Sequence, residues 1–404
     1  MSQLSYLEKL LDGVEVERRE LGEVCRFING RAYKKAELLE KGKYPVLRVG
    51  NFFTNNHWYY SDLELDEDKY CDNGDLLYAW SASFGPRIWQ EGKVIYHYHI
   101  WKVIPNTEII KKKYLFYLLD WDTEALKAEQ STGSTMKHIG KGLIEKRMLP
   151  IPPLNIQAEI VRILDTFTEL TAELTAELTA RQQQYAYYRD QLLTFEEGDA
   201  VWKKLGDVAK KISSGGTPKT GIAEYWDGGT IPWMSSGEVN LKSVYETEKY
   251  ITESGLKNSS AKIVPKNSIV IALAGQGTTR GKVARTRIDL TTNQSLAFLT
   301  FDEAQINSDY VYYFLETQYE NLRQISSGSG TRGGLNLKMI SNYEIPIPAL
   351  AEQKRIVSIL DKFDALTTSL TEGLPREIEL RQQQYEYYRD LLLSFPKPEV
   401  VAHD

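Results

Sequence analysis

A stretch of fifteen residues occurs twice in this chain almost unchanged. RQQQYAYYRDQLLTF begins at Arg181 and RQQQYEYYRDLLLSF begins at Arg381. The segments before them also agree, because PIPPLNIQAEIVRILD ends at Asp165 and PIPALAEQKRIVSILD ends at Asp361. The chain is therefore interpreted as a tandem duplication, in which each copy is a divergent globular half followed by a well-matched helix.

The duplication decides how the 404 residues divide. A chain of this length is too long for one core, so we expect two globular domains and two helical segments. Short runs of Val, Ile, Leu and Tyr between Gly, Pro, Asn and Ser predict strands that alternate with helices, so each domain is of mixed α/β class. The expected parts are a first domain at 1–150 with its N-terminal segment, a first helix at 151–198, a second domain at 199–347, and a second helix with a tail at 348–404.

The two repeated segments carry apolar residues at spacings of three and four, which is typical of a helix that buries one face. The nearest cover for each apolar face is the other copy, so we expect two long antiparallel helices that form a coiled-coil spacer between the domains. The alternative is that each helix packs separately on its own domain. The apolar positions are Ile160, Leu164, Phe167, Leu170, Leu174 and Leu178 in the first copy and Ile356, Leu360, Phe363, Leu366 and Leu370 in the second.

A regular four-residue repeat, ELTAELTAELTA, occupies residues 169–180 of the first helix. One such unit adds about 6 Å of helical rise and about 40° of net rotation. One base pair of B-DNA advances about 3.4 Å and turns about 34–36°. The rotation of one unit matches that of one base pair and its rise is larger, so one unit would re-space two DNA-binding ends by about one base pair. The second helix instead contains Gly373 and Pro375, which predict a break near Gly373.

The charges are unevenly distributed along a chain whose net charge is -6. Residues 151–200 hold 3 basic and 9 acidic side chains, whereas residues 1–150 balance 22 against 22 and residues 201–347 hold 17 basic and 14 acidic ones. The acidity lies in the helices, so DNA would meet the globular halves and the helices remain available to protein partners.

Polar residues that interrupt the predicted strands are candidates for contacts with bases and phosphates. Arg, Lys, Asn and Gln present paired donors or acceptors to base edges, and Ser and Thr suit phosphates. In the first half the candidates are Arg31, Tyr33, Lys34, Lys35, Arg48, Asn51, Asn55, His57, Ser83, Arg87, Ser134, Lys137 and His138. In the second half they are Thr217, Lys219, Ser235, Ser236, Gln276, Thr278, Thr279, Arg280, Lys282, Asn293, Gln294, Ser329, Thr331 and Arg332.

Catalytic and metal-binding motifs are missing from the sequence. AGQGTTRGKVA resembles a phosphate loop, but five residues separate Gly275 from Gly281 where four are required, and the residue after Lys282 has no hydroxyl. Two cysteines and five scattered histidines predict no zinc site and no disulfide framework. We therefore expect no catalysis by this chain on its own and no bound metal. No apolar run approaches the length of a membrane span and no signal peptide is recognisable, so a cytoplasmic location is expected.

These features together resemble the specificity (S) subunit of type I restriction-modification systems, in the type IC-like subfamily whose first helix carries variable TAEL repeats. The resemblance covers essentially the full length and rests on ELTAELTAELTARQQQYAYYRDQLL, DALTTSLTEGLPREIELRQQQYEYYRDLLLSF and MSQLSYLEKLLDGVEVE. It implies two target-recognition domains that each read one half of a bipartite, asymmetric DNA sequence, with paired helices that set the gap.

The same resemblance implies partners for the helices. They would hold two methyltransferase (M) subunits, which bind S-adenosylmethionine and methylate adenine, and restriction (R) subunits would add translocation and cleavage driven by ATP with Mg. It implies no cofactor on this chain. The competing hypothesis is a non-catalytic protein–protein scaffold with two α/β binding ends, and steep salt dependence of binding distinguishes DNA recognition from it. A third hypothesis is an enzyme whose motif is unrecognised.

Tyrosines cluster near the end of each repeated segment. Such amphipathic side chains either anchor partner subunits or close the helix pair, and the sequence leaves both roles open. The tyrosines are Tyr185, Tyr187 and Tyr188 in the first copy and Tyr385, Tyr387 and Tyr388 in the second.

Overall fold

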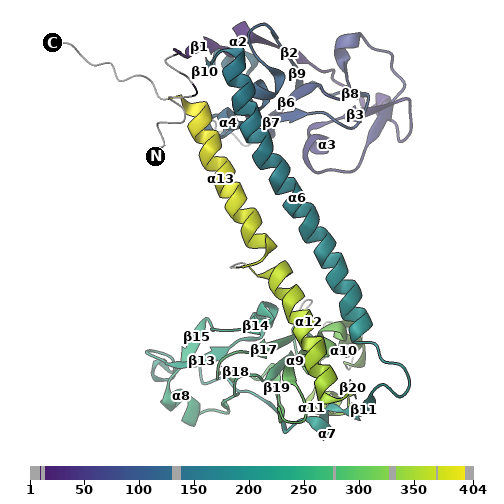
Figure 1. Cartoon of the computed structure of the whole chain (residues 1–404), viewed down its shortest axis with the longest axis vertical. Coiled ribbons are helices and arrows are strands. Elements are labelled where there is room, and N and C mark those ends of the chain that lie inside the picture. The colour runs from purple at the N-terminus through teal and green to yellow at the C-terminus, as the bar shows by residue number, and fades with distance from the viewer. Residues whose placement is uncertain are drawn as a thin grey trace, which may run out of the picture. The chain divides into compact units, whose positions relative to one another are not determined.

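The computed structural model of the chain describes residues 10, 14–129, 138–275, 279–326, 334–369 and 372–395 (Figure 1). Contacts divide the chain into two compact units, one made of Met1–Thr175 with Glu377–Asp404 and the other of Ala176–Arg376. Each unit holds sheets, short helices and parts of the two long helical segments. The predicted mixed α/β class with two sheet-containing domains and long helices is confirmed.

The first unit contains two four-stranded sheets and a two-stranded ladder. One sheet has the antiparallel order β2 (Cys25–Asn29), β9 (Ile100–Pro105), β6 (Leu76–Ser81), β7 (Ser83–Ile88). The other has the order β4 (Tyr59–Ser61), β3 (Tyr44–Leu47), β8 (Val94–Tyr96), β5 (Tyr70–Cys71), with β3 and β8 parallel. The ladder pairs β1 (Glu17–Glu20) with β10 (Met148–Ile151). Its helices are α2 (Leu21–Val24), α3 (Val49–Phe53), α4 (Lys112–Glu129) and α5 (Lys141–Glu145), with 3-10 turns η1 (Lys35–Glu37) and η2 (Glu67–Lys69).

The second unit has a five-stranded sheet, a three-stranded sheet and a matching ladder. The larger sheet has the order β12 (Lys211–Ser214), β19 (Leu296–Thr300), β16 (Ile269–Ala272), β17 (Val283–Thr286), β14 (Ser243–Val244). The smaller has the order β15 (Lys249–Ile251), β13 (Ile231–Met234), β18 (Thr291–Thr292), and the ladder pairs β11 (Val201–Lys204) with β20 (Glu344–Ile347). Its helices are α7 (Leu205–Val208), α8 (Glu253–Lys257), α9 (Ser308–Thr317), α10 (Tyr319–Ile325) and α11 (Leu337–Ser341), with 3-10 helices η3 (Ala223–Tyr225) and η4 (Ser236–Leu241).

One inner strand in each unit, β6 in the sheet β2-β9-β6-β7 and β16 in the five-stranded sheet, is buried on both faces. In β6, Leu76 and Tyr78 belong to the core beneath α4, and the alternate residue Leu77 belongs to the core on the other face. In β16, Ile269 and Val270 likewise point into two different cores. A strand whose successive side chains alternate between two apolar layers must be apolar throughout, which explains the unbroken hydrophobic runs of the sequence.

The duplication is visible in the hydrogen bonds of fully buried glutamines. The side chain of Gln157 donates to the carbonyl of Pro152 at 2.7 Å, and that of Gln353 donates to the carbonyl of Pro348 at 2.9 Å. The side-chain oxygen of Gln157 accepts the N–H of Lys111, just before α4, at 2.8 Å. The side-chain oxygen of Gln353 accepts the N–H of Asn307, just before α9, at 2.9 Å. Equivalent side chains thus tie each long helix to its own domain in the same way.

The two long helical segments differ in continuity. Helix α6 runs unbroken over Leu154–Leu192, whereas the second copy forms α12 (Leu350–Thr368) and α13 (Leu374–Ser394), so the predicted break near Gly373 is confirmed (Figure 1). Pro375 lies in the first turn of α13, where its missing N–H is not needed. A Cβ at Gly373 would lie 2.5 Å from the carbonyl oxygen of Ala365, so glycine is required there. None of the helices in the described parts of the chain is long and apolar enough to cross a membrane.

Candidate DNA interface

A tight turn of His97, Tyr98 and His99 joins β8 to β9 in the first unit, and we call it the HYH turn. The N–H of His97 donates to the carbonyl of Leu47 at 2.9 Å, and the N–H of His99 approaches Nδ1 of His97 at 3.4 Å. Gly30 passes so close beneath that a Cβ there would lie 2.2 Å from the carbonyl oxygen of Tyr96. The turn is therefore held by backbone contacts from two other segments.

The same turn recurs in the second unit as Asn293, Gln294 and Ser295, which we call the NQS turn. The N–H of Asn293 donates to the carbonyl of Met234 at 3.1 Å, and the N–H of Ser295 donates to Oδ1 of Asn293 at 3.0 Å. Here Gly215 passes beneath, and a Cβ there would lie 2.0 Å from Thr292. The two turns share a backbone and its supports, and they differ in every side chain.

Aromatic rings surround the HYH turn. Trp80 of β6 lies 5.0 Å from His99, 5.8 Å from His138 and 6.1 Å from Tyr98, measured between ring centroids. Its indole N–H donates to the carbonyl of Tyr98 at 2.9 Å, and His97 stacks on Tyr33 at 6.4 Å. The rings thus form one connected group that fixes the orientation of the turn.

Two imidazoles of this group, those of His97 and His99, have a lowered pKa. Burial, followed by the nearby charges of His99 and Arg48, lowers the pKa of His97 to about 4. Burial and His138 also lower the pKa of His99. A neutral imidazole offers one donor and one acceptor and no net charge, so this surface is suited to hydrogen bonding and ring contacts more than to attracting phosphates.

Two predicted arginines lie beside the HYH turn. Arg31 forms a bidentate pair with Glu37 at 2.8 and 3.0 Å and lies over the ring of Tyr33 at 5.3 Å. The hydrogen bond from Arg31 is the main reason that the pKa of Glu37 is lowered to about 2. Arg48 is exposed, with its guanidinium 5.4 Å from the ring centroid of Tyr59. Arg31 is therefore largely neutralised, and Arg48 is the more accessible cation.

Some candidates in the first unit have structural roles. Asn51 is only 8% exposed, and its amide donates to the carbonyls of Asn55 at 2.9 Å and His57 at 2.8 Å. Arg87 donates to the carbonyl of Phe52 at 2.9 Å. The side chain of Asn51 thus shapes the segment after α3, and a DNA contact by this residue stays a prediction. The candidates with exposed side chains in this unit are Lys34, Lys35, Arg48, Asn55, His57, Ser83 and His138.

In the second unit the structure joins two candidates that are far apart in sequence. The hydroxyl of Thr217 is hydrogen-bonded to Oε1 of Gln294, so the amide of the NQS turn is oriented by a neighbouring segment. Ser235 directly precedes η4, and its backbone N–H donates to Glu238 at 2.6 Å in a capping box. Ser236 is half-buried in the same helix, and Lys219 is exposed.

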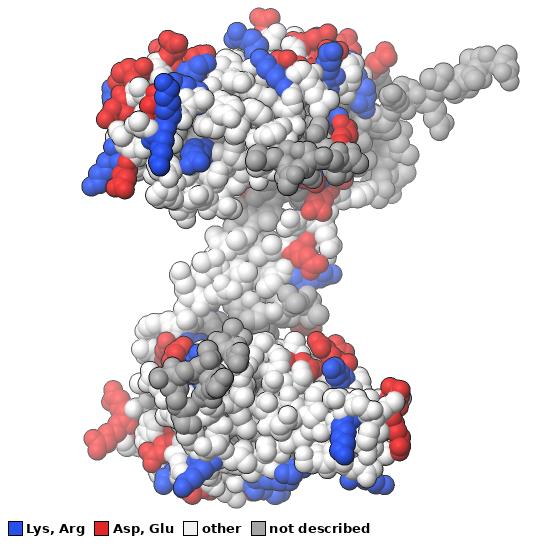
Figure 2. Space-filling model, turned by 180° about the vertical axis from the view of Figure 1, so that it is seen from behind, with Lys and Arg blue, Asp and Glu red and all other residues white. Residues whose placement is uncertain are grey.

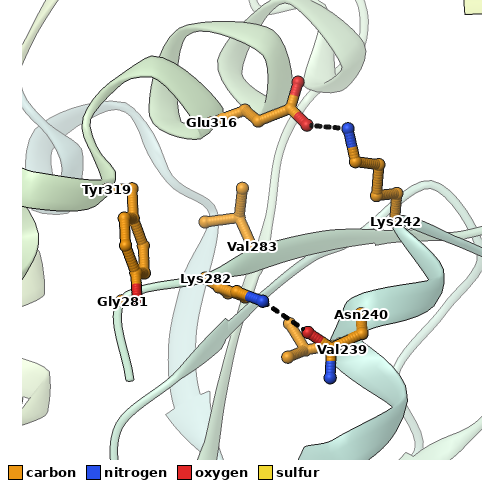
Figure 3. A pocket seen from close by; sticks show the side chains of 8 residues that line it. All are labelled: Val239, Asn240, Lys242, Gly281, Lys282, Val283, Glu316 and Tyr319. Carbon is orange, nitrogen blue, oxygen red and sulfur yellow. Dashed lines mark hydrogen bonds and ion pairs between the residues drawn. The ribbon is translucent and has the colours of Figure 1, made fainter. Parts of the chain in front are cut away.

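Lys282 lines a small cavity of about 180 Å³ in the second unit (Figure 3). Its ammonium donates to Oδ1 of Asn240 at 2.7 Å, while Lys242 pairs with Glu316 across the cavity at 2.6 Å. Both ammonium groups are thus engaged within the protein. Thr279 and Arg280 are half-buried nearby, and the candidates outside the described residues are Ser134, Lys137, Gln276, Thr278, Ser329, Thr331 and Arg332.

The charged surface is mixed on the face that Figure 2 draws, where basic and acidic side chains are interspersed over both domains. Within the described parts of the chain, no group of three or more His, Cys, Asp or Glu side chains is arranged to hold a metal ion. The two domains therefore differ at equivalent turns that carry different side chains, and the described residues show neither a charge cluster on this face nor a metal site.

Comparison with known proteins connects this geometry to a family. The family model described as type I restriction modification DNA specificity domain matches residues 13–181 and 198–380. The chain belongs to the type I restriction-modification specificity family. It is 39% identical over 427 aligned positions to the specificity subunit of the type I restriction enzyme EcoR124I/EcoR124II of Escherichia coli, with 100% of both chains covered. It is 32% identical to a putative type I specificity subunit of Haemophilus influenzae, with 97% of this chain and 98% of the relative covered.

The fold agrees with solved structures of the same family. The crystal structure of the S subunit from M. genitalium superposes with a TM-score of 0.59 at 16% identity, covering 96% of this chain and 98% of that one. At such low identity the likeness concerns the fold alone.

In this specificity-family chain the repeated helices pack together within each unit. In the first unit Phe167 of α6 stacks on Tyr388 of α13 at 5.3 Å, and Ile160 shares a core with Leu392. The beginning of α6 therefore lies against the end of α13, as expected for antiparallel helices. These helix ends also join the domain core, so the two arrangements considered from the sequence coexist in this unit.

The second unit repeats this packing with the other ends of the helices. Tyr188 near the end of α6 stacks on Phe363 of α12 at 5.8 Å, and Ile356 and Leu360 are fully buried. Leu366 is 38% exposed, so its predicted burial is wrong, because α12 ends two residues later. Among the apolar positions of α6, Leu164 is fully buried and Leu170, Leu174 and Leu178 are half-buried. Leu370 of the second copy lies outside the described residues.

The tyrosines of the two repeats separate into inner and outer positions. Tyr185 and Tyr385 pack against the cores, and burial raises the pKa of both, to about 12 for Tyr385. Tyr187 is 61% exposed and Tyr387 is 44% exposed. The inner pair closes the helix packing, and the outer pair leaves an aromatic surface on each unit.

Proposed function

We propose that this chain is the DNA sequence-specificity subunit of a type I restriction-modification complex, in which each domain reads one half of a bipartite, asymmetric target. The observation that carries the proposal is the duplication: both halves match the specificity-domain family model, and equivalent buried glutamines tie each domain to its long helix. Two copies of one scaffold that carry different side chains suit an asymmetric target with two half-sites.

The helices have a separate role in this proposal. The regular TAEL segment of the unbroken helix α6 sets the distance between half-sites, and two methyltransferase subunits dock on the helical segments. The exposed Tyr187 and Tyr387 are placed to contribute one docking contact each, since tyrosine combines a large apolar face with a polar tip.

The chemistry belongs to the partners. We expect this chain to catalyse nothing by itself, to carry no cofactor, and to act in the cytoplasm. S-adenosylmethionine would bind the methyltransferase subunits, and ATP with Mg would bind the restriction subunits joined through the methyltransferase core. Methylation by the purified chain with S-adenosylmethionine and no partner would contradict this assignment.

Binding and methylation by the chain co-purified with its methyltransferase subunits test the proposal. The complex should methylate one bipartite sequence, and its affinity for DNA should fall by about a thousandfold or more between 50 and 200 mM salt if six to ten phosphates are contacted. The alternative, a scaffold that binds other proteins at its two α/β ends, predicts no sequence preference for any duplex and no such salt dependence.

A further inference from the structure

We propose that the HYH turn and the NQS turn are the base-selecting elements of the two domains, the first acting through aromatic rings and the second through amides. This inference rests on the proposed function and names the part of each domain that carries it.

The first argument is positional equivalence. In each unit the turn joins a strand with a parallel partner, β8 or β18, to an antiparallel strand of the unit's other sheet, β9 or β19. The carbonyl of the last turn residue also accepts a backbone bond: that of His99 from the N–H of Trp80 in β6 at 3.1 Å, and that of Ser295 from the N–H of Leu273 just after β16 at 2.8 Å. Because the frame is the same, exchanging the three residues changes the displayed chemistry and leaves the support in place.

The second argument concerns the amides of the NQS turn. The carboxamide oxygen of Asn293 accepts the N–H of Ser295, and that of Gln294 is hydrogen-bonded to the hydroxyl of Thr217. With both oxygens held inside the protein, the amide nitrogens are the groups left to face a ligand. They are donors, which match the N7, O6 and O4 acceptors that bases display in the major groove.

The third argument concerns the rings of the HYH turn. Tyr98 is 36% exposed while its carbonyl is held by the indole N–H of Trp80, so an exposed ring stands on a fixed backbone. Burial lowers the pKa of the His97 and His99 rings, so these rings offer phosphates less positive charge than ordinary histidines. Their contribution is therefore to shape, apolar contact and single hydrogen bonds, which discriminate between base edges.

Exchanging the turns is the direct test, made in the complex with methyltransferase subunits. One variant carries His97→Asn, Tyr98→Gln and His99→Ser, and the reciprocal variant carries the reverse changes at Asn293, Gln294 and Ser295. Methylation is measured on a library of duplexes in which both half-sites are randomised. Each variant should alter preference at one or more positions of a single half-site by about 5- to 150-fold per base, while the other half-site and the gap stay unchanged.

The matched control is Lys41→Gln, an exposed residue of the first unit outside the turn. It removes a positive charge and should leave the target unchanged. Where thermal unfolding shows that a triple variant does not fold, the single changes Tyr98→Ala and Gln294→Ala replace it.

Unchanged preferences in folded turn variants would overturn this inference while leaving the proposed function intact. A wild-type complex without any sequence preference would instead remove the proposed function itself. A variant that alters both half-sites also counts against the inference, because each turn belongs to one domain.

Discussion

Replacing Arg285 by methionine should destabilise the second unit much more than the matching change destabilises the first. Arg285 of β17 is 5% exposed, and its guanidinium lies 3.0 Å from Asp361, 3.3 Å from Asp309 and 3.4 Å from Asp364. Its Nε also donates to Ser243 at 2.7 Å. This one side chain therefore joins the large sheet to α9 and α12.

The magnitude follows from what the substitution leaves behind. Methionine fills a similar volume, but Asp361 and Asp364 then lose their cation, while Asp309 keeps its pair with Arg287 at 2.8 Å. Breaking a buried ion pair costs about 3–5 kcal/mol. The Asp361 side chain is 43% exposed, so water re-solvates part of the lost interaction and the lower end, about 3 kcal/mol, is expected. At about 2–4 °C per kcal/mol, the unfolding midpoint of this unit should fall by about 6–12 °C.

The first unit supplies the control. There the long helix is held by Lys113, which pairs with Asp165 at 2.6 Å and is 54% exposed. Lys113→Met should cost less than about 1 kcal/mol, since exposed pairs contribute little. Calorimetry of the full chain, with hydrogen exchange of α4 and α9 to assign each transition, measures both variants. Equal effects of the two substitutions would refute the reasoning from burial.

Three further predictions concern other parts of the chain. Deleting Glu173–Ala176 should shorten the gap in the methylated sequence by about one base pair, and an altered half-site would count against a spacer role for the repeat. Gly373→Ala should cost about 1–3 kcal/mol because its Cβ would lie 2.5 Å from Ala365, whereas Gly221→Ala, which meets open space, should change the midpoint of denaturant unfolding little. The pKa of His97 is lowered to about 4, so the unfolded chain takes up the proton first as pH falls. The free energy of unfolding should therefore decrease as pH drops from about 6.5 toward 4, and His97→Asn should flatten that decrease. An unchanged pH profile of unfolding in this variant would show that the ring is not buried as described.

The features that depend on repetition and local pattern were predicted correctly from the sequence. Matching segments revealed the duplication, apolar spacing located the helices, and Gly373 with Pro375 located the break. Such features need no knowledge of what lies far away along the chain. The order of strands within the sheets was not predicted, because pairing joins distant segments that carry no mutual signal in one sequence.

The candidate interface was predicted only in part, for a related reason. Asn293 and Gln294 were identified, but the equivalent His97 and Tyr98 were missed. The signal was present, since the buried Gln157 and Gln353 are 196 positions apart and the same offset joins the two turns. It was hidden because the turns differ in every side chain, and only their shared hydrogen bonds show that they are equivalent.

The exposure of the other candidates could not be predicted, because it depends on tertiary contacts. A polar residue after a strand looks the same in sequence whether it meets solvent or supports a neighbouring loop. The amide of Asn51 holds the backbone of Asn55, and the backbone N–H of Ser235 is bonded to Glu238. Periodicity similarly predicted burial of Leu366, but the end of α12 leaves it partly exposed.

The central claim is that the two domains read separate halves of one DNA target. Its most direct test replaces residues 199–347 with the corresponding domain of another member of the family, in the complex with methyltransferase subunits, and maps every methylated adenine in the genome of cells that express it. The account predicts a methylated sequence with one half-site changed and the other half-site and gap length preserved. A sequence changed at both half-sites, or unchanged at both, would contradict it.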